Sequence, residues 1–539
     1  MRDIGQGQSF IDFTLRNRIY VDKTEQLSKL LKKDRVFISR PRRFGKSLML
    51  DTIGTLFEEG VDPYFKGTWI YDNWTEQQYP VLRLNFLEYN SSDYNEFKER
   101  LANRIKRFAS KLNLAEYIHD PAPSNCLISL FDELNDARRK IVILIDEYDT
   151  QLTANINNAE LYKLYQEMIR DLYGVIKGKQ CIRFLCVTGV TRLKDVSIFS
   201  VGSDILDMSY SSPVSTITGF TREEIRKYYI DYIDLAVSLD KGIPEELVTE
   251  QQRDELLSKL AVEYDGYCFD DEYTNKVFST WSVNNFFSEI VSRRKVIFGD
   301  YWYANGGVPS ILARYLETHI IQLEDYTKDI KVKRNDFLNP TSLLDMKQPV
   351  LMCQTGYLTA HSRVPDGGTI TLGIPNMEVR RSLTSLLSER IFPGVDFSQS
   401  DNETIFSEAS PEEIVEKLNS LMNTISYENY KSMNEKTVQE LLHAFFIGAD
   451  QPVRTEVQSA SGRSDIVLEY ENRRVVFELK YAENEADCQA QLREAVNQIR
   501  TRRYGDQLPE KALLQIALVF NGDKTVRQFT HYEVVEQAD

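Results

Sequence analysis

A short polar segment near the start of this chain has the residue types and spacing that phosphate binding requires. The segment, RPRRFGKS at residues 40–47, follows an apolar run at 36–39 and precedes a helical pattern that starts at Leu48. The N-terminus of a helix offers unpaired backbone amides and the positive end of the helix dipole, and both favour a bound phosphate. The sequence therefore predicts a phosphate-binding loop between a strand and a helix.

Single residues within this loop have separate expected roles. Gly45 lets the backbone approach a phosphate, Lys46 can bridge the β- and γ-phosphates of ATP, and Ser47 can ligate Mg²⁺. The loop departs from the pattern GxxxxGK[ST], because Arg40 replaces the first glycine and Pro41 withholds one amide donor. The residues expected to contact the nucleotide are Arg43, Phe44, Gly45, Lys46, Ser47 and Leu48.

An acidic motif further along the chain supports the same site. The apolar run at 141–145 ends in Asp146 and Glu147, and such a strand typically accompanies a phosphate-binding loop. Asp146 would hold the magnesium shell, whereas Glu147 would polarise the attacking water. An ordinary strand with an acidic turn is the alternative, but the order of the two motifs favours an ATP site. Beyond the next strand, Thr188 and Arg192 are candidates to sense the γ-phosphate, unless Arg192 is only a loop residue.

A hairpin expected near the C-terminus brings two carboxylates and an ammonium together. Residues 462–470 and 474–480 are expected to be strands joined by a short turn. Alternation places Glu478 and Lys480 on one face, and the hairpin brings Asp465 close to both. The carboxylates suit a hard divalent cation, and the lysine can position or deprotonate water for attack on a phosphodiester. A surface salt bridge across the hairpin is the alternative.

Residues around this hairpin are candidates to complete the site. Additional metal ligands would come from Glu435, Glu440 or Glu456, the first two in a helix upstream. Gln498 and Tyr504, in and after an amphipathic helix, lie near arginines that could meet a phosphate backbone. The basic stretches that could contact nucleic acid are 100–111 and 500–503, with a solvated helix face as the alternative for both.

The elements that must position these residues alternate along the first third of the chain. Strands that alternate with helices predict an α/β fold with a mainly parallel sheet covered on both faces. The middle of the chain has a more helical and irregular pattern, in which Thr221 is expected to cap a helix. The expected strands are 36–39, 81–86, 141–145 and 184–188, the expected helices 95–112, 159–176 and 411–425, and the expected linker 398–410.

Composition excludes several classes of protein. The net charge of −16 argues against coating nucleic acid with the whole surface, although a local basic face would still bind it. No run approaches about 18 apolar residues, and the first residues lack the apolar core of a signal peptide, so neither a membrane span nor secretion is expected. The six cysteines and five histidines lack paired metal-ligand spacing, which predicts free thiols in the cytoplasm and no zinc site.

Taken together, the motifs resemble a known family. The chain is similar to bacterial AAA-ATPase-like proteins fused to a PD-(D/E)XK nuclease-superfamily domain, and the resemblance covers nearly the whole chain. In that family the phosphate-binding loop also carries arginine in place of its first glycine. The resemblance rests on YVDKT (20–24), SRPRRFGKS (39–47), LIDEYD (144–149), VSIFS (196–200), YDGY (264–267), YW (301–302), PNMEVR (375–380), GRSD (462–465), FELK (477–480) and Gln498 with Tyr504.

The resemblance implies a particular domain organisation and ATP and Mg²⁺ as ligands. The expected parts are a P-loop AAA-like ATPase domain at 1–215, a helical, winged-helix-like lid at 216–395, a linker and helix at 396–434, and a restriction-endonuclease-like α/β domain at 435–539.

The expected function is that of an ATP-dependent or ATP-regulated nuclease. Its partner would be nucleic acid, with DNA favoured over RNA, and a homo-oligomer stays open. The rivals are an ATP-switched signalling or scaffold protein that binds nucleic acid without cutting it, and an interaction protein with neither activity. The expected catalytic residues are Glu147, Asp465, Glu478 and Lys480, and the expected metal ligands are Ser47, Asp146, Asp465 and Glu478.

Overall fold

The protein forms two compact units. The computed structural model describes residues 1–539 except 6, 8, 90–92, 194–203, 305–310, 313–328, 341, 344, 364–367, 384–401, 424–432, 450, 452, 460–461, 471, 503–511 and 536–539. The first unit comprises Met1–Ile320 and Tyr326–Arg380, and the second comprises Ile321–Asp325 and Arg381–Asp539. Separate hydrophobic cores stabilise the two units.

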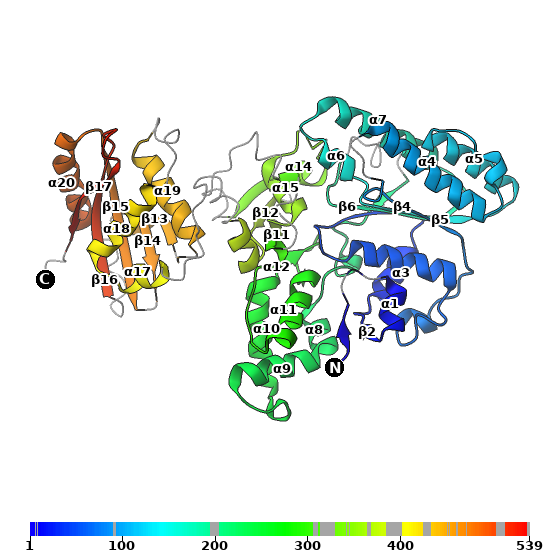
Figure 1. The fold of residues 1–539 in the computed structure, drawn as a ribbon, viewed down its shortest axis with the longest axis horizontal. Coiled ribbons are helices and arrows are strands. Elements are labelled where there is room, and N and C mark those ends of the chain that lie inside the picture. The colour runs from blue at the N-terminus through cyan, green and yellow to red at the C-terminus, as the bar shows by residue number, and fades with distance from the viewer. Residues whose placement is uncertain are drawn as a thin grey trace. The chain divides into compact units, whose positions relative to one another are not determined.

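A five-stranded sheet forms the centre of the first unit (Figure 1). Its strands lie in the order β4-β5-β6-β3-β7, and every neighbouring pair is parallel, which confirms the predicted α/β fold. The carboxyl ends of parallel strands meet at one edge, so the loop after β3 lies near the acidic end of β5, with β6 between them. The strands are β3 (Arg35–Ser39), β4 (Val81–Asn85), β5 (Ile141–Asp146), β6 (Ile182–Gly189) and β7 (Leu206–Asp207).

Helices cover both faces of this sheet, with α1 and α3 on one side and α4, α5 and α7 on the other (Figure 1). The sequence explains this packing, because α4 buries Phe97, Leu101, Ile105 and Phe108, which recur at helical spacing along one stripe. The helices are α1 (Phe10–Leu15), α2 (Thr24–Leu31), α3 (Lys46–Glu59), α4 (Tyr94–Lys111), α5 (Pro123–Asp136), α6 (Thr150–Ala154) and α7 (Ala159–Ile176), and a two-stranded sheet joins β1 (Asp3–Ile4) to β2 (Arg18–Ile19).

The middle of the chain is helical and belongs to the same compact unit. Its first helix begins as the sequence predicts, because Thr221 and Glu224 form a capping box around the start of α8. The elements are α8 (Arg222–Tyr228), α9 (Ile230–Lys241), α10 (Glu250–Tyr264), the hairpin of β8 (Tyr267–Cys268) and β9 (Lys276–Val277), α11 (Thr280–Arg293) and α12 (Tyr301–Ala304).

A small winged-helix-like group completes the first unit. Two helices follow its first strand, and an antiparallel hairpin then closes a three-stranded sheet in the order β10-β12-β11. The elements are β10 (Ile330–Lys333), α14 (Arg334–Leu338), α15 (Gln348–Thr355), β11 (Thr359–Arg363) and β12 (Thr369–Gly373).

The second unit is built on a mixed sheet in the order β13-β14-β15-β16-β17 (Figure 1). Strands β15 and β16 are parallel, so the chain must cross over between them, and α20 makes that connection on one face of the sheet. Helices α17, α18 and α19 pack on the other face. The elements are α17 (Asn402–Glu408), α18 (Pro411–Met422), α19 (Glu435–Gly448), β13 (Val453–Ser459), β14 (Gly462–Glu469), β15 (Arg473–Ala482), α20 (Glu485–Arg502), β16 (Ala512–Asn521) and β17 (Gln528–Val534).

One element corrects the sequence prediction. The expected linker at 398–410 contains α17, and its Phe406 is fully buried in the core of the second unit. The sequence did not indicate this helix, because its two apolar side chains, Ile405 and Phe406, are adjacent and give no periodic pattern.

All six cysteines are unpaired and buried. Five of them lie in the first unit, whereas Cys488 lies in the second. Among the described helices, none combines the length and the apolar character that a bilayer span requires.

Candidate functional site

The phosphate-binding loop connects β3 to α3, as the sequence predicts. Gly45 caps the start of α3 with φ 84°, a left-handed conformation that glycine adopts without strain. Arg43 also has a positive φ, of 69°. These two left-handed residues turn the chain sharply, so the first amides of α3 face the space where a phosphate is expected to bind.

Lys46 lies at the base of this loop and is only 4% exposed. Its ammonium donates to the carbonyl of Arg40 at 3.1 Å and to that of Pro41 at 3.2 Å. The Glu147 carboxylate lies 3.5 Å from the same ammonium. Lys46 is therefore held where an incoming phosphate would replace carbonyl oxygens as its partner.

Asp146 joins the loop to the two central strands of the sheet. Its carboxylate accepts hydrogen bonds at 2.6 Å from Ser47 Oγ, at 2.6 Å from Thr188 Oγ1 and at 3.0 Å from the amide of Glu147. The predicted residues Ser47, Asp146 and Thr188 therefore lie together. Arg192 is engaged elsewhere, because its guanidinium forms an ion pair with Asp207.

Glu147 directly follows the end of β5 and has a positive φ of 51°. Such a conformation is uncommon for a residue with a side chain, and it aims this carboxylate at Lys46 rather than along the strand. The neighbouring Asp149, which the sequence analysis did not select, is buried and accepts a hydrogen bond from the Thr191 amide at 2.6 Å. Burial raises the pKa of the Asp149 carboxyl, and the nearby Glu147 carboxylate acts in the same direction.

Arg40, which replaces the usual first glycine of the motif, has a structural role. Its guanidinium is buried over the ring of Phe269 and donates to Thr218 Oγ1 at 3.1 Å and to the carbonyls of Ser39 and Ser209 at 2.8 and 2.6 Å. Burial lowers the pKa of Arg40 to about 10, so the group is still a cation at neutral pH. Arg40 thus fastens the loop to distant parts of the first unit.

The loop opens into a cavity of about 540 Å³. Its walls come from four parts of the chain: the segment before β3, the loop with α3, the residue after β5, and the helical middle. The lining includes Gly45, Lys46, Ser47, Leu48 and Glu147 together with Tyr20, Lys23, Tyr229, Trp281 and Asn284. Volume and lining suit a small polar ligand with an apolar part.

Most of this wall was not predicted from the sequence. Trp281 stacks on the guanidinium of Arg43 at 4.4 Å, and Lys23 forms an ion pair with Glu224. Arg43 also donates to the carbonyls of Tyr301 and Trp302, at 3.0 and 2.9 Å. Arg43 therefore links the loop to the helical region, and its contact with the nucleotide stays a prediction. The motif YVDKT at 20–24 marked part of the wall, but no local pattern pointed to Trp281.

The second predicted group lies in the second unit, on the hairpin of β14 and β15. Ile466 pairs with Phe477, so the next position along the antiparallel ladder places Asp465 opposite Glu478. Asp465 accepts a hydrogen bond from the Leu479 amide at 2.7 Å. The register therefore places Asp465 and Glu478 at opposing positions of adjacent strands, as the sequence predicts.

Lys480 connects this pair to α19. Its ammonium lies 3.8 Å from Glu478 Oε1 and donates to Glu435 Oε1 at 3.2 Å. Glu478 and Lys480 are both buried, whereas Glu435 is half exposed. Glu435, predicted as an additional metal ligand, forms an ion pair with the lysine, and its role as a ligand stays a prediction.

The remaining candidates around this hairpin have other partners or lie outside the described residues. Gln498 donates to Glu494 at 3.2 Å along α20, and Arg500 forms an ion pair with Glu533. The side chains of Glu440 and Glu456, and the whole of Tyr504, lie outside the described residues. In the other basic stretch, Arg100 pairs with Glu96 on the surface of α4, as on a solvated helix face.

Both predicted sites offer oxygen donors that suit Mg²⁺. Ser47 and Asp146 place a hydroxyl and a carboxylate 2.6 Å apart, and Asp465 and Glu478 place two carboxylates on adjacent strands. Hard divalent cations prefer such donors. The residues present therefore fit the metal that the resemblance implies at each site.

The loop on the parallel sheet defines a P-loop nucleotide-binding fold, and the mixed sheet of the second unit carries the carboxylate–lysine group. Residues 4–199 match the family described as predicted AAA-ATPase, and residues 433–530 match the PD-(D/E)XK nuclease superfamily. The chain thus joins a predicted AAA-ATPase domain to a PD-(D/E)XK nuclease-superfamily domain, which confirms the resemblance seen in the sequence.

Comparison with individual proteins adds no activity. The chain is 26% identical to an uncharacterized protein in the vnfD 5′ region of Azotobacter chroococcum, over 90% of this chain and 89% of that protein. The structure of the Aeropyrum pernix ORC1 protein in complex with DNA is similar over 71% of this chain and 96% of its own, with 10% identity and a TM-score of 0.27. The corresponding values for CDC6P from Pyrobaculum aerophilum are 68%, 93%, 10% and 0.23. Scores of this size say nothing about ligands or partners.

Proposed function

We propose that this protein binds and hydrolyses ATP and that its nucleotide state controls a metal-dependent phosphodiesterase acting on nucleic acid, DNA in preference to RNA. The observation that carries the ATP part is the 2.6 Å hydrogen bond between Ser47 and Asp146, because it unites the loop with the acidic strand. The phosphodiesterase part rests on the placement of Asp465, Glu478 and Lys480 on one hairpin.

At the nucleotide site, each residue has a role set by its position. Lys46 binds the phosphates when it leaves the carbonyls of the loop, and Ser47 and Asp146 hold Mg²⁺. Glu147 accepts a proton from water, because its carboxylate stands beside Lys46 at the mouth of the loop. Thr188 orients Asp146 from the adjacent strand.

At the second site, Asp465 and Glu478 would hold a divalent cation. When bound, that cation would polarise the phosphodiester and lower the pKa of a water ligand. Lys480 orients the attacking water and stabilises negative charge on phosphate oxygens. Glu435 keeps the Lys480 ammonium in place through an ion pair of 3.2 Å.

We also place the protein in the cytoplasm, since six unpaired cysteines suit a reducing compartment. A homo-oligomer is compatible with this proposal, and light scattering with and without ATP would measure it.

The test is cleavage of labelled DNA and RNA by wild type, Lys46→Ala and Asp465→Ala, with Mg²⁺, with and without ATP. We expect cleavage of DNA that needs ATP and is lost in both variants. Loss in Asp465→Ala alone would mean that the two sites act independently. Absence of cleavage by a wild-type protein that binds ATP would overturn the proposal in favour of an ATP-switched scaffold.

A further inference from the structure

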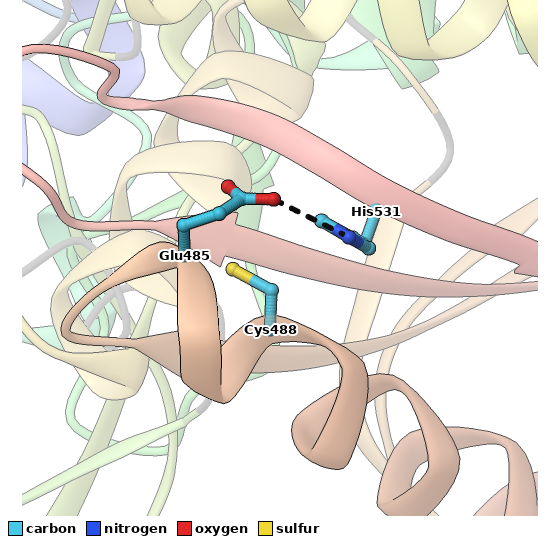
Figure 2. A group of neighbouring side chains, drawn as sticks. All are labelled: Glu485, Cys488 and His531. Atoms are coloured by element: carbon cyan, nitrogen blue, oxygen red, sulfur yellow. Dashed lines mark ion pairs between the residues drawn. The ribbon is translucent and has the colours of Figure 1, made fainter.

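Three side chains of different ligand types meet at one end of the second unit. Glu485 and Cys488 lie on the first turn of α20, and His531 lies on β17, which packs against that helix. Figure 2 shows the three side chains turned toward one another from these two elements. One ligand atom from each residue lies within 4.8 Å of the other two.

The separations suit a tetrahedral transition-metal site. Zinc bonds of about 2.0–2.3 Å to nitrogen, oxygen and sulfur place neighbouring ligand atoms about 3.5 Å apart. Glu485 Oε1 and His531 Nε2 are already 3.7 Å apart. A contraction of at most about 1.3 Å would bring Cys488 Sγ to the same metal.

Hydrogen bonds from neighbouring residues orient the His531 and Glu485 side chains. Thr530 Oγ1 lies 3.0 Å from His531 Nδ1, so a proton on Nδ1 leaves Nε2 as the metal-facing nitrogen. Asn521 donates to Glu485 Oε2 at 2.7 Å, which turns Oε1 toward His531. Such outer contacts fix ring and carboxylate orientation in metal sites, and an isolated surface ion pair does not need them.

We propose that Glu485, Cys488 and His531 form a binding site for a transition-metal ion, Zn²⁺ by ligand chemistry. A thiolate and an imidazole select such a metal, whereas the oxygen donors Asp465 and Glu478 select Mg²⁺. With three protein ligands, a fourth position stays open to water. The 66% exposure of Glu485 gives the ion a path from solvent. A bound ion would tie the start of α20 to β17.

Linear spacing could not reveal this site. Glu485 and Cys488 have the i, i+3 spacing of helix neighbours, but His531 joins them only because α20 and β17 pack together. The expectation of no zinc site rested on spacing alone, and the fold supplies the missing proximity.

The test is titration of the full-length protein with Co²⁺, which gives a thiolate-to-cobalt charge-transfer band only when sulfur is a ligand. We expect the band to saturate at one ion per chain and Zn²⁺ to abolish it by competition. Cys488→Ser and His531→Gln should lose the band. Removing the outer contact in Asn521→Ala should weaken Co²⁺ binding roughly 10- to 100-fold.

Control variants separate this site from other sites. Cys126→Ser removes a buried thiol of the first unit and should keep the band, and Asp465→Asn should keep it as well. Circular dichroism checks that Cys488→Ser and His531→Gln fold, and an upward shift of Tm with Zn²⁺ should occur in wild type but not in these variants.

Three results would overturn the proposal: no charge-transfer band in wild type, a band that survives in Cys488→Ser, or an equal Zn²⁺ shift of Tm in all variants. The first result would reduce the cluster to a His531–Glu485 ion pair. None of these results depends on whether the protein cuts nucleic acid.

Discussion

The two predicted sites differ in how far apart their residues lie along the chain. The nucleotide cavity is closed by pairs such as Lys23 and Glu224, which are 201 positions apart. Asp465, Glu478 and Lys480, by contrast, come from a single hairpin. The first site therefore exists only when the whole first unit has folded, whereas the second needs mainly local strand pairing.

This contrast predicts different vulnerabilities. A change far from the phosphate-binding loop can disturb the nucleotide site, because Arg40 and Arg43 fasten the loop to the helical region. The carboxylate–lysine group responds mainly to changes in its own side chains. Four substitutions test this difference, from the largest expected effect to the smallest.

Glu478→Gln should lower the rate of Mg²⁺-dependent cleavage about 10³-fold or more, because a carboxylate that holds the cation contributes several kcal/mol to the transition state. ATP hydrolysis should be unchanged. Single-turnover cleavage and phosphate release measure the two rates, with the exposed Glu483→Gln as the control. A parallel loss of ATP hydrolysis would show that the two sites are not separable.

Glu147→Gln should lower ATP hydrolysis about 10²- to 10³-fold, the usual contribution of a positioned general base. ATP should still bind, because Lys46 and Ser47 are unchanged. Calorimetry measures binding, and phosphate release measures turnover, with Glu160→Gln on the surface of α7 as the control. Normal hydrolysis by this variant would remove Glu147 from the chemistry.

Arg40→Met should lower the free energy of unfolding of the first unit by about 2 kcal/mol, since it leaves buried carbonyls and a hydroxyl without their donor. Urea denaturation measures this change, and the exposed neighbour in Arg42→Met serves as the control. The second unit should unfold as in wild type. Equal stability of Arg40→Met and wild type would show that the buried arginine does not fasten the loop.

Asp149→Asn should change how stability depends on pH. Burial raises the pKa of Asp149 in the folded protein, so its stabilising protonated form is present below the unfolded pKa of about 3.9 and is lost as the pH rises through the folded pKa. Relative to Asp149→Asn, wild type should therefore lose stability as the pH rises from about 4 toward neutral.

Urea denaturation over that range measures the difference between the two proteins. The exposed Asp171→Asn should follow wild type. A constant difference between wild type and Asp149→Asn across the range would contradict the raised pKa.

The same contrast explains what the sequence could predict. The sheet strands, the loop at 40–47 and the hairpin site follow from period and spacing, which act over a few residues. Thr188 could be predicted because it lies at the end of an expected strand, and the carboxyl ends of parallel strands meet at one edge of the sheet. Trp281 and Asn284 were not found, since their approach to the loop depends on packing between the helical region and α3. The guanidinium of Arg192 forms an ion pair with Asp207 on β7, and the sequence did not indicate this partner.

The helix α17 and the Glu485–Cys488–His531 cluster were missed for related reasons. The adjacent Ile405 and Phe406 form no periodic pattern, and His531 lies 43 residues after Cys488 in the sequence. Both the helix and the cluster depend on tertiary packing, so local sequence patterns cannot predict them.

Because every cysteine is buried, the reactivity of the thiols can measure local opening of the structure. A thiol reagent reaches a buried sulfur only when the surrounding structure opens, so labelling rates measure local opening when the reagent outpaces reclosing. Five thiols report on the first unit and Cys488 alone reports on the second. Mass spectrometry of the labelled peptides would therefore follow local opening of each unit separately, in unmodified protein, while ATP is added.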